Sequence, residues 1–173
     1  SIYIGIPFCP TRCVYCSFTA YPYHLWENRA EEYIEKLGEE LADIVKMNAT
    51  PAASEALRAH DINASIISHS ENVNAPGMHH KGNILSGKEL QTIYIGGGTP
   101  SVLSAELIEK LMQTIEKYVD ISKLAEFTFE AGRPDTITRE KLEVLRRHNV
   151  TRISINPQTM CQKTLDLIGR KHT

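Results

Sequence analysis

The chain has 173 residues, of which 42% are hydrophobic and 23% charged, with a formal net charge of −2 at pH 7. These values are typical of a globular protein with a single hydrophobic core. They argue against a nucleic-acid partner, because neutralising phosphates requires a basic surface. No apolar run approaches the roughly 20 residues of a membrane span, and no basic region precedes the first apolar run as in a signal peptide. We therefore expect neither a nucleic-acid partner nor a membrane span.

Four apolar runs with strand character alternate with helical segments along the chain. The strands are expected at residues 2–6, 92–95, 126–130 and 152–155. The helices are expected at about 28–47, from 105 to about 119, from 139 to about 148, and from about 160. Their apolar residues recur every three or four positions, which is the period of a helix packed on a core. The expected apolar stripes of the first two helices are Tyr33, Ile34, Leu37, Leu41, Ile44 and Val45, and Leu107, Ile108, Leu111, Met112, Ile115 and Val119. Ser104 and Thr138 are the expected N-caps of the two middle helices.

The β-α alternation predicts parallel strands with helices packed outside them. A doubly wound open sheet and part of a (β/α) barrel both fit, and both place functional groups at the carboxyl ends of the strands. The loops at those ends are expected at residues 9–16, 96–100, 130–135 and 156–158. Four βα units cannot close a barrel, so we expect a bare edge on the fourth strand and a fragment of a longer protein.

Residues 48–89 contain no aromatic residue or cysteine but five asparagines. A segment of this composition cannot bury much surface, so we expect a surface insertion with a short helix around 53–60. His79 and His80 are adjacent within it and could bind a metal. Solvated loop histidines are the favoured interpretation, because no other ligand lies at a suitable spacing.

Three cysteines, Cys9, Cys13 and Cys16, form a C-x3-C-x2-C triplet on the loop that follows the first strand. Three thiolates this close can surround one small metal centre. A [4Fe–4S] cluster usually takes four cysteines, so three leave one iron open to bind a small molecule. The spacing therefore fits a catalytic cluster better than a structural zinc site, which needs four ligands.

A structural zinc site is the alternative, with a distant fourth ligand from His24, Cys161 or His172. Cys161 otherwise reads as an inert buried thiol. Cysteines clustered as ligands, without the pattern of a secreted disulfide framework, indicate a reducing compartment, and we expect the cytoplasm.

Two further loops carry candidate binding groups. The glycine-rich run 96–100 exposes backbone N–H and C=O groups and lacks the lysine of a phosphate-binding loop. Glu130 ends the third strand at the same edge, where its carboxylate suits hydroxyl or ammonium groups. Arg12, Arg133 and Arg152 could pair with carboxylates of a substrate, although solvated ion pairs are the simpler interpretation.

The chain resembles the radical S-adenosylmethionine (SAM) superfamily in five runs, namely Y-I-G-I-P-F-C-P-T-R-C-V-Y-C-S-F, I-Y-I-G-G-G-T-P-S, E-F-T-F-E, R-I-S-I-N-P-Q and L-I-G-R-K-H. More closely, it is similar to the oxygen-independent coproporphyrinogen III oxidase family, and residues 130–135 with 156–160 resemble its HemZ-like branch. The resemblance covers all but about residues 48–89. It implies one radical SAM core domain over 1–173, a partial TIM-like barrel of about four βα units.

The resemblance also implies roles for individual residues. Cys9, Cys13 and Cys16 would hold three irons of a [4Fe–4S] cluster, and the fourth iron would bind SAM. The residues that match SAM-contacting positions of the family are Tyr3, Tyr15, Gly97, Gly98, Thr99, Glu130, Gln158 and Arg170. Tyr3 could equally be an ordinary strand residue, since it alternates with two isoleucines.

The implied activity is oxidative decarboxylation of the propionate groups of coproporphyrinogen III to vinyl groups in haem biosynthesis. The implied chemistry starts when the cluster passes one electron to SAM, and a donor such as flavodoxin or ferredoxin would supply it. One position departs from the oxidase pattern, because Phe18 stands where that enzyme has a further cysteine. The related haem chaperones share this feature, so a haem carrier without oxidase activity is the alternative.

Overall fold

The computed structural model describes residues 1–18, 20–49 and 90–173. The expected insertion at 48–89 lies outside the described residues except at its start, because the first long helix continues to residue 49. The expected short helix around 53–60 and the pair His79 and His80 also lie outside them.

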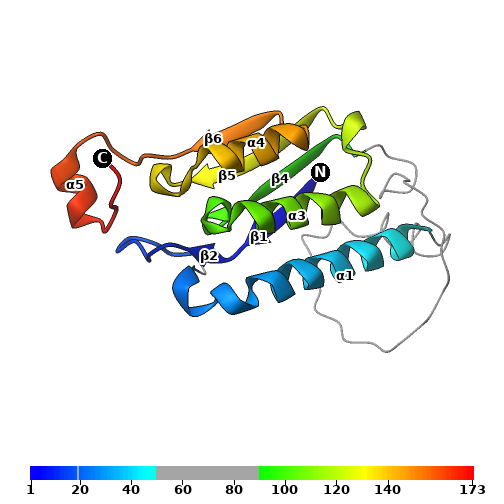
Figure 1. Cartoon of the computed structure of the whole chain (residues 1–173), viewed down its shortest axis with the longest axis horizontal. Coiled ribbons are helices and arrows are strands. Elements are labelled where there is room, and N and C mark those ends of the chain that lie inside the picture. The colour runs from blue at the N-terminus through cyan, green and yellow to red at the C-terminus, as the bar shows by residue number, and fades with distance from the viewer. Residues whose placement is uncertain (19, 50–89) are drawn as a thin grey trace.

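Four parallel strands form one sheet in the order β1-β4-β5-β6 (Figure 1). The strands are β1 (Ile2–Ile6), β4 (Thr92–Gly97), β5 (Glu126–Gly132) and β6 (Arg152–Ile155). All four match strands expected from the sequence, and β4 and β5 each extend two residues further. The parallel (β/α) class is therefore confirmed.

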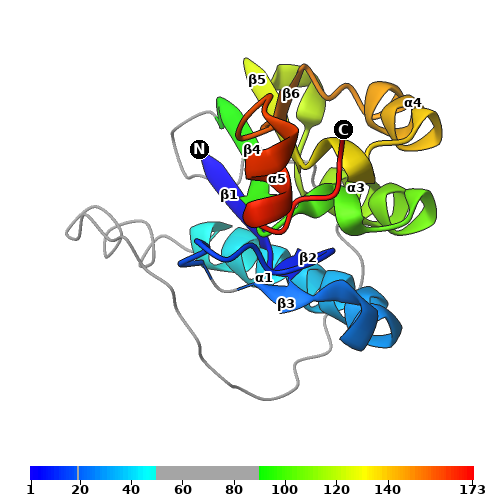
Figure 2. The same ribbon diagram turned by 90° about the vertical axis from the view of Figure 1, so that its left-hand side faces the viewer.

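Three helices pack in front of the sheet and a fourth stands beyond the carboxyl ends of its strands (Figures 1 and 2). The helices are α1 (Ala30–Ala49), α3 (Ala105–Tyr118), α4 (Arg139–Arg147) and α5 (Gln162–Leu167). The Ser104 side chain accepts a hydrogen bond from Leu107 N, and Thr138 accepts one from Lys141 N. Both expected N-caps are therefore confirmed. No helix in the described part of the chain is long and apolar enough to cross a membrane.

Short elements join these helices and strands. Single turns of 3-10 helix lie at Tyr23–Leu25, Glu27–Arg29, Pro100–Val102, Ile121–Lys123 and Pro134–Thr136. Two strands of two residues each, β2 (Phe8–Cys9) and β3 (Tyr21–Pro22), pair with each other in parallel. The sequence pattern did not predict this pair, which is too short to show a period. This pairing holds the two ends of the loop between β2 and β3 side by side. This loop carries Cys13 and Cys16 and begins at Cys9, and it is called the cysteine loop below.

The core lies between the sheet and the three helices. Alternate strand residues point into it, including Ile4, Ile95 and Phe129, which stand opposite one another on neighbouring strands. The expected apolar stripe of α3 is buried except Leu107, which is partly buried. In α1 the expected stripe is too wide, because Ile44 is 38% exposed at the edge of the helix.

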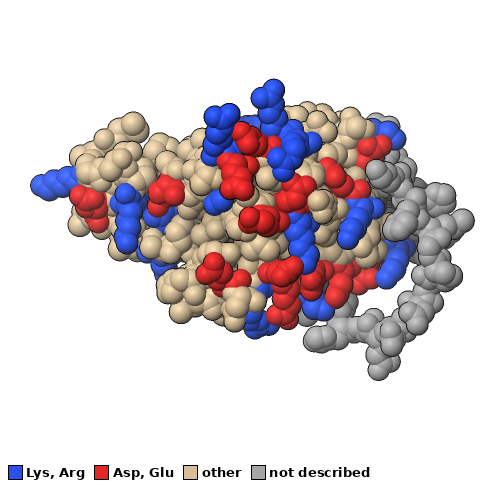
Figure 3. Space-filling view, viewed as in Figure 1, with Lys and Arg blue, Asp and Glu red and all other residues tan. Residues whose placement is uncertain are grey.

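The helix-covered surface carries charges of both signs side by side (Figure 3). Lys110 of α3, for example, lies 2.8 Å from Glu31 and 2.7 Å from Glu35 of α1. Interspersed ion pairs of this kind give no broad basic area on this face.

Candidate functional site

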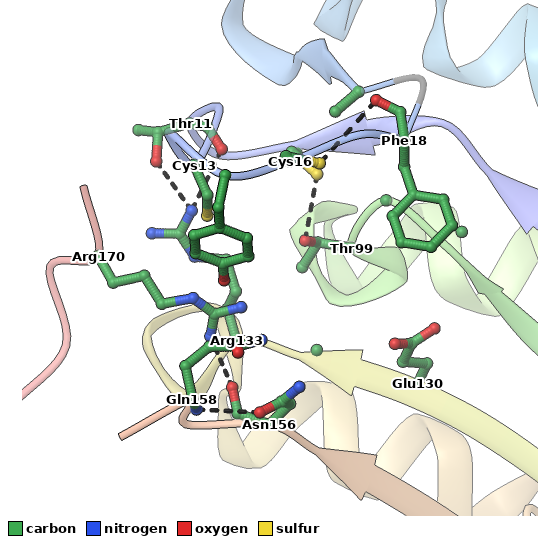
Figure 4. A pocket seen from close by; sticks show the side chains of 16 residues that line it. Thr11, Cys13, Cys16, Phe18, Thr99, Glu130, Arg133, Asn156, Gln158 and Arg170 are labelled. Atoms are coloured by element: carbon green, nitrogen blue, oxygen red, sulfur yellow. Dashed lines mark hydrogen bonds between the residues drawn. The ribbon is translucent and has the colours of Figure 1, made fainter. Parts of the chain in front are cut away.

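A cavity of about 160 Å³ opens at the carboxyl ends of the strands. It is lined by residues from the loops after all four strands and from the turn after α5 (Figure 4). The lining residues are Cys9, Thr11, Cys13, Tyr15, Cys16, Phe18, Ala20, Gly97, Gly98, Thr99, Glu130, Gly132, Arg133, Asn156, Gln158 and Arg170. Segments as far apart in sequence as Cys9 and Arg170 thus meet at one edge of the sheet, where parallel α/β folds place their sites.

The three cysteines of the triplet all line this cavity as free thiols. Cys9 is buried at the end of β2, whereas Cys13 and Cys16 are half-buried on the turn that follows. The Cys9 Sγ atom lies 3.4 Å from Thr99 Oγ1. Burial raises the pKa of the Cys9 thiol, and the contact with Thr99 opposes that rise.

The glycine-rich loop is joined by its backbone to the end of β1 and to β2. The Gly98 N–H donates to Ile6 O and the Thr99 N–H donates to Phe8 O, each at 2.7 Å. A Cβ atom on Gly98 would lie 2.7 Å from Phe8 O and 3.0 Å from Cys9 Sγ. Only a residue without a side chain lets the two loops come this close, so the glycine is required by the contact with the cysteine loop.

Glu130 is half-buried on β5 and borders the cavity beside the glycine-rich loop. Burial raises the pKa of its carboxyl group, and the Gly97 backbone acts in the opposite direction. Tyr3 is not among the lining residues. It is 63% exposed, and its ring stacks on Tyr94 with the centroids 5.9 Å apart. Its neighbour toward the cavity is Glu130, whose charge adds to burial in raising the pKa of the Tyr3 hydroxyl.

Arg170 reaches the cavity because the chain reverses at the end of α5. Gly169 has φ +77°. The Arg170 N–H donates to Leu165 O at 2.9 Å, which makes the turn a Schellman cap. The Arg170 side chain is 7% exposed, and its Nη1 donates to Asn156 O at 2.6 Å. Its Nε has no hydrogen-bond partner among the described residues. A buried donor without an acceptor is costly, and a carboxylate ligand would satisfy it.

Two more candidates lie at the rim of the cavity. Tyr15 is 50% exposed, with a pKa that burial raises and that the charge of Arg170 counteracts. Gln158 has φ +67°, and its backbone N–H donates to Asn156 Oδ1 at 2.9 Å. This side-chain hydrogen bond supports a backbone conformation that residues other than glycine rarely adopt.

The structure changes the interpretation of two residues. Arg133, which the sequence suggested as a solvated ion-pair partner, is only 2% exposed and lines the cavity. Cys161, expected to be buried, is exposed at the N-terminus of α5. Within α5 itself, Leu165 is the buried side chain, so Cys161 at the N-cap lies outside the part of this segment that packs inward. Arg152, by contrast, forms the expected exposed ion pair, 3.2 Å from Glu126.

A structural zinc site would need a fourth ligand besides the three cysteines. His24, Cys161 and His172, the three possible fourth ligands, do not line the cavity. Across residues 1–18, 20–49 and 90–173, no group of three His, Cys, Asp or Glu side chains converges as around a single ion. A four-iron cluster makes a different demand, because each of its ligands binds a separate iron. Three free thiols around one cavity, with an unsatisfied buried arginine beside them, fit such a cluster with a charged small molecule.

Comparison with known proteins identifies the class of protein that this fold and site define. The sequence model of the radical SAM superfamily matches residues 83–173, just over half of the chain. The chain belongs to the radical SAM superfamily. Members of this superfamily generally use a [4Fe–4S] cluster with SAM.

Two known proteins are similar to this chain over nearly all of its length. The chain is 38% identical over its whole length to the oxygen-independent coproporphyrinogen-III oxidase-like protein HemZ of Bacillus subtilis and covers 28% of that protein. It is 32% identical over 99% of its length to the heme chaperone HemW of the same organism and covers 35% of it. The chain therefore spans about a third of the length of these relatives.

A solved structure has the same fold. The coproporphyrinogen III oxidase HemN of Escherichia coli, described as a radical SAM enzyme, matches the whole chain with a TM-score of 0.68. The chain covers 31% of that protein at 20% identity, so the likeness concerns the fold alone.

Proposed function

We propose that the cavity binds a [4Fe–4S] cluster through Cys9, Cys13 and Cys16 and binds SAM beside it. One observation carries this proposal: the cysteine loop shares a single cavity with an acidic, a basic and a glycine-rich element from the other loops. SAM carries an amino group, a carboxylate and a sulfonium, so a site for it needs both signs of charge. Glu130 and Arg170 supply them at the cavity wall.

Each remaining candidate has a role in this proposal. The backbone of Gly97, Gly98 and Thr99 would receive the amino group, with Glu130 as its counter-charge or as acceptor for a ribose hydroxyl. Arg170 would bind the carboxylate through its unsatisfied Nε. The rim residues Tyr15 and Gln158 would border the adenosyl group, and Tyr3 would act at a distance, through Glu130. When bound, the cluster and SAM supply one-electron cleavage of a sulfonium and hydrogen abstraction from an unactivated carbon.

The substrate class that we propose is a tetrapyrrole, with coproporphyrinogen III as the first candidate. Each propionate converted to a vinyl group would lose CO₂, one proton and two electrons, and the net acceptor of the proton and both electrons would be one molecule of SAM, which is cleaved to methionine and 5′-deoxyadenosine. The name of the HemZ relative supports this candidate. The reaction also needs a one-electron donor, for which a flavodoxin or ferredoxin is suitable, and a reducing compartment such as the cytoplasm, which four free cysteines suit.

A haem carrier is the second candidate, and Phe18 is the observation that favours it. Phe18 is 71% exposed and lines the cavity where the resembled oxidase has a further cysteine. An exposed aromatic ring beside the cysteine loop suits contact with a flat apolar ligand. The name of the HemW relative, a heme chaperone, points the same way.

The test uses the full-length protein, reconstituted anaerobically with iron and sulfide. We would measure 5′-deoxyadenosine formed from SAM with and without coproporphyrinogen III, together with vinyl products. Formation that depends on the porphyrinogen and yields vinyl product supports the oxidase. Stoichiometric haem binding without decarboxylation supports the carrier. A protein that retains zinc and no iron would contradict both.

A further inference from the structure

We propose that Arg133 is the positioning residue of the cysteine loop and sets the electrostatic environment of the thiolates. This inference rests on the proposed function, because it assigns Arg133 a role toward the same cluster. The sequence suggested only a surface ion pair or a contact with substrate. The structure places Arg133 in the lining of the cavity, where its guanidinium lies between β5 and the cysteine loop (Figure 4).

The contacts of Arg133 reach the loop at its centre. Its Nη1 donates to Thr11 Oγ1 at 2.8 Å and to Thr11 O at 3.2 Å. Thr11 lies midway between Cys9 and Cys13 in the sequence, so both of these thiols lie two residues from the held position. The cysteine loop also forms a hydrogen bond to the turn after α5, in which the Thr11 hydroxyl donates to Gly169 O at 3.4 Å.

The other side of the guanidinium is fixed by Asp135. Arg133 Nε lies 3.3 Å from Asp135 Oδ1 and Nη2 lies 3.5 Å from Oδ2, a two-point contact that sets the plane of the fork. Asp135 is held by the rigid 3-10 turn Pro134–Thr136 at the end of β5. Arg133 thus links the cysteine loop to the end of β5 and fixes the position of the loop relative to the sheet.

A substrate-binding role does not fit these contacts. The side chain is 2% exposed and makes four hydrogen bonds, two to Thr11 and two to Asp135, so most of its five N–H groups already have acceptors. A group that binds a propionate must keep donors free toward the cavity, as Arg170 does. Arg133 therefore acts through Thr11 and through its charge.

The positive charge of Arg133 also affects how easily the cluster is reduced. A buried cation next to a cluster stabilises the state with one more electron, because that state is more negative. Asp135 offsets part of this effect but is itself 26% exposed, so solvent screens it more than it screens Arg133. Loss of the guanidinium should make the cluster harder to reduce, whereas loss of the Thr11 contact alone should not.

The experiment compares variants of the full-length, anaerobically reconstituted protein. Arg133→Met removes the charge and the hydrogen bonds, and Arg133→Lys keeps the charge but loses the planar guanidinium. Thr11→Val loses the hydrogen bonds of the hydroxyl to Arg133 and Gly169 but keeps the Thr11 backbone oxygen as an acceptor for Arg133. Arg139→Met is the matched control, because Arg139 is 93% exposed and pairs with Glu143 on the same helix. The measurements are the midpoint potential of the cluster by redox-monitored EPR and the rate of iron loss to a chelator.

We expect Arg133→Met to lower the equilibrium constant for cluster reduction about tenfold, which is about 59 mV for a one-electron couple. Arg133→Lys and Thr11→Val should keep the wild-type potential and lose iron several-fold faster. Arg139→Met should match the wild type in both measurements. A purely structural role would change iron loss without moving the potential.

Wild-type potential in Arg133→Met, or wild-type iron loss in both Arg133→Lys and Thr11→Val, would overturn the inference while leaving the proposed function standing. If Arg133→Met does not fold, the other two variants decide. Failure of the wild-type protein to take up iron and sulfide would instead contradict the proposed function, and this inference with it.

Discussion

At the scale of single residues, three of the four cysteines line the cavity and the fourth does not. Cys13 is half-buried and lines the cavity, whereas Cys161 is exposed and lies outside it. We predict that Cys13→Ala abolishes cluster assembly and that Cys161→Ala assembles it normally. Both predictions are checked by measuring iron and acid-labile sulfide per chain after anaerobic reconstitution. Full iron and sulfide in Cys13→Ala would refute its role as a ligand.

Gly98 leaves less room for a Cβ atom than Gly97 and Gly132, the other glycines that line the cavity. A Cβ atom there would meet the backbone oxygen of Phe8 and the sulfur of Cys9, neither of which can move without displacing a loop. We predict that Gly98→Val lowers the affinity for SAM by at least about tenfold, or 1.4 kcal/mol. Equilibrium dialysis measures it. Gly5→Ala is the control, because its Cβ has an ordinary 3.5 Å contact with Tyr3.

At the scale of elements, α5 and its terminal turn decide where Arg170 lies. Gly169 has a positive φ, which costs other L-residues about 1–2 kcal/mol, although asparagine tolerates it better. We predict that Gly169→Val weakens SAM binding several-fold by displacing Arg170, and that Gly169→Asn weakens it less. Equal dissociation constants for the two variants would show that the turn does not position Arg170.

Side-chain hydrogen bonds of His148 join the end of α4 to α3. The ring of His148 lies 2.7 Å from Glu116 and 2.8 Å from Glu109. Burial alone would lower the pKa of His148, but the hydrogen bonds to the two carboxylates outweigh it and raise the pKa above 6.5. The hydrogen bonds from His148 and Arg147 lower the pKa of Glu109 to about 2.

These shifts set the pH range in which the cluster of His148, Glu109 and Glu116 stabilises the fold. The histidine contribution is complete below its unfolded pKa of 6.5 and is lost as the pH rises through the raised folded value. The Glu109 contribution is present above 4.5 and is lost as the pH falls toward about 2.

We predict that His148→Gln destabilises the protein by about 1–2 kcal/mol at pH 6, since it removes two charge-assisted hydrogen bonds. The difference from wild type should shrink at pH 9. Thermal unfolding at the two pH values measures it. A difference that does not change with pH would mean that the imidazolium charge contributes nothing.

At the scale of the whole molecule, four strand-end loops and the turn after α5 share one cavity. A ligand that bridges them should stabilise all of them together, because binding to the folded state alone shifts the equilibrium of local opening. We predict that SAM added to the cluster-loaded protein slows hydrogen exchange at residues 9–18, 96–100, 130–136, 156–160 and 168–172. Exchange measured by mass spectrometry tests this. Protection confined to the cysteine loop would contradict a site shared by all the loops.

Much of this architecture could be predicted from the sequence. The strands, the caps Ser104 and Thr138 and the convergence of the loops follow from local patterns, because period and capping depend on neighbouring residues. The prediction failed where burial depends on distant segments. Ile44 fits the apolar stripe of α1 but lies at its edge and is 38% exposed. Cys161 is exposed because it precedes α5, a short helix in which Leu165 is the buried residue.

The sequence by itself determined the parallel (β/α) class, the edge of the sheet that holds the site, and the motifs of the radical SAM superfamily. These are local properties, carried by spacing within about twenty residues. Only the tertiary structure decided that Arg133 is buried against Thr11, that Arg170 keeps an unsatisfied Nε, and that Tyr3 stands outside the cavity. The reason is physical: burial and hydrogen-bond partnership are set by segments far apart in the chain, and a one-dimensional pattern does not contain those distances.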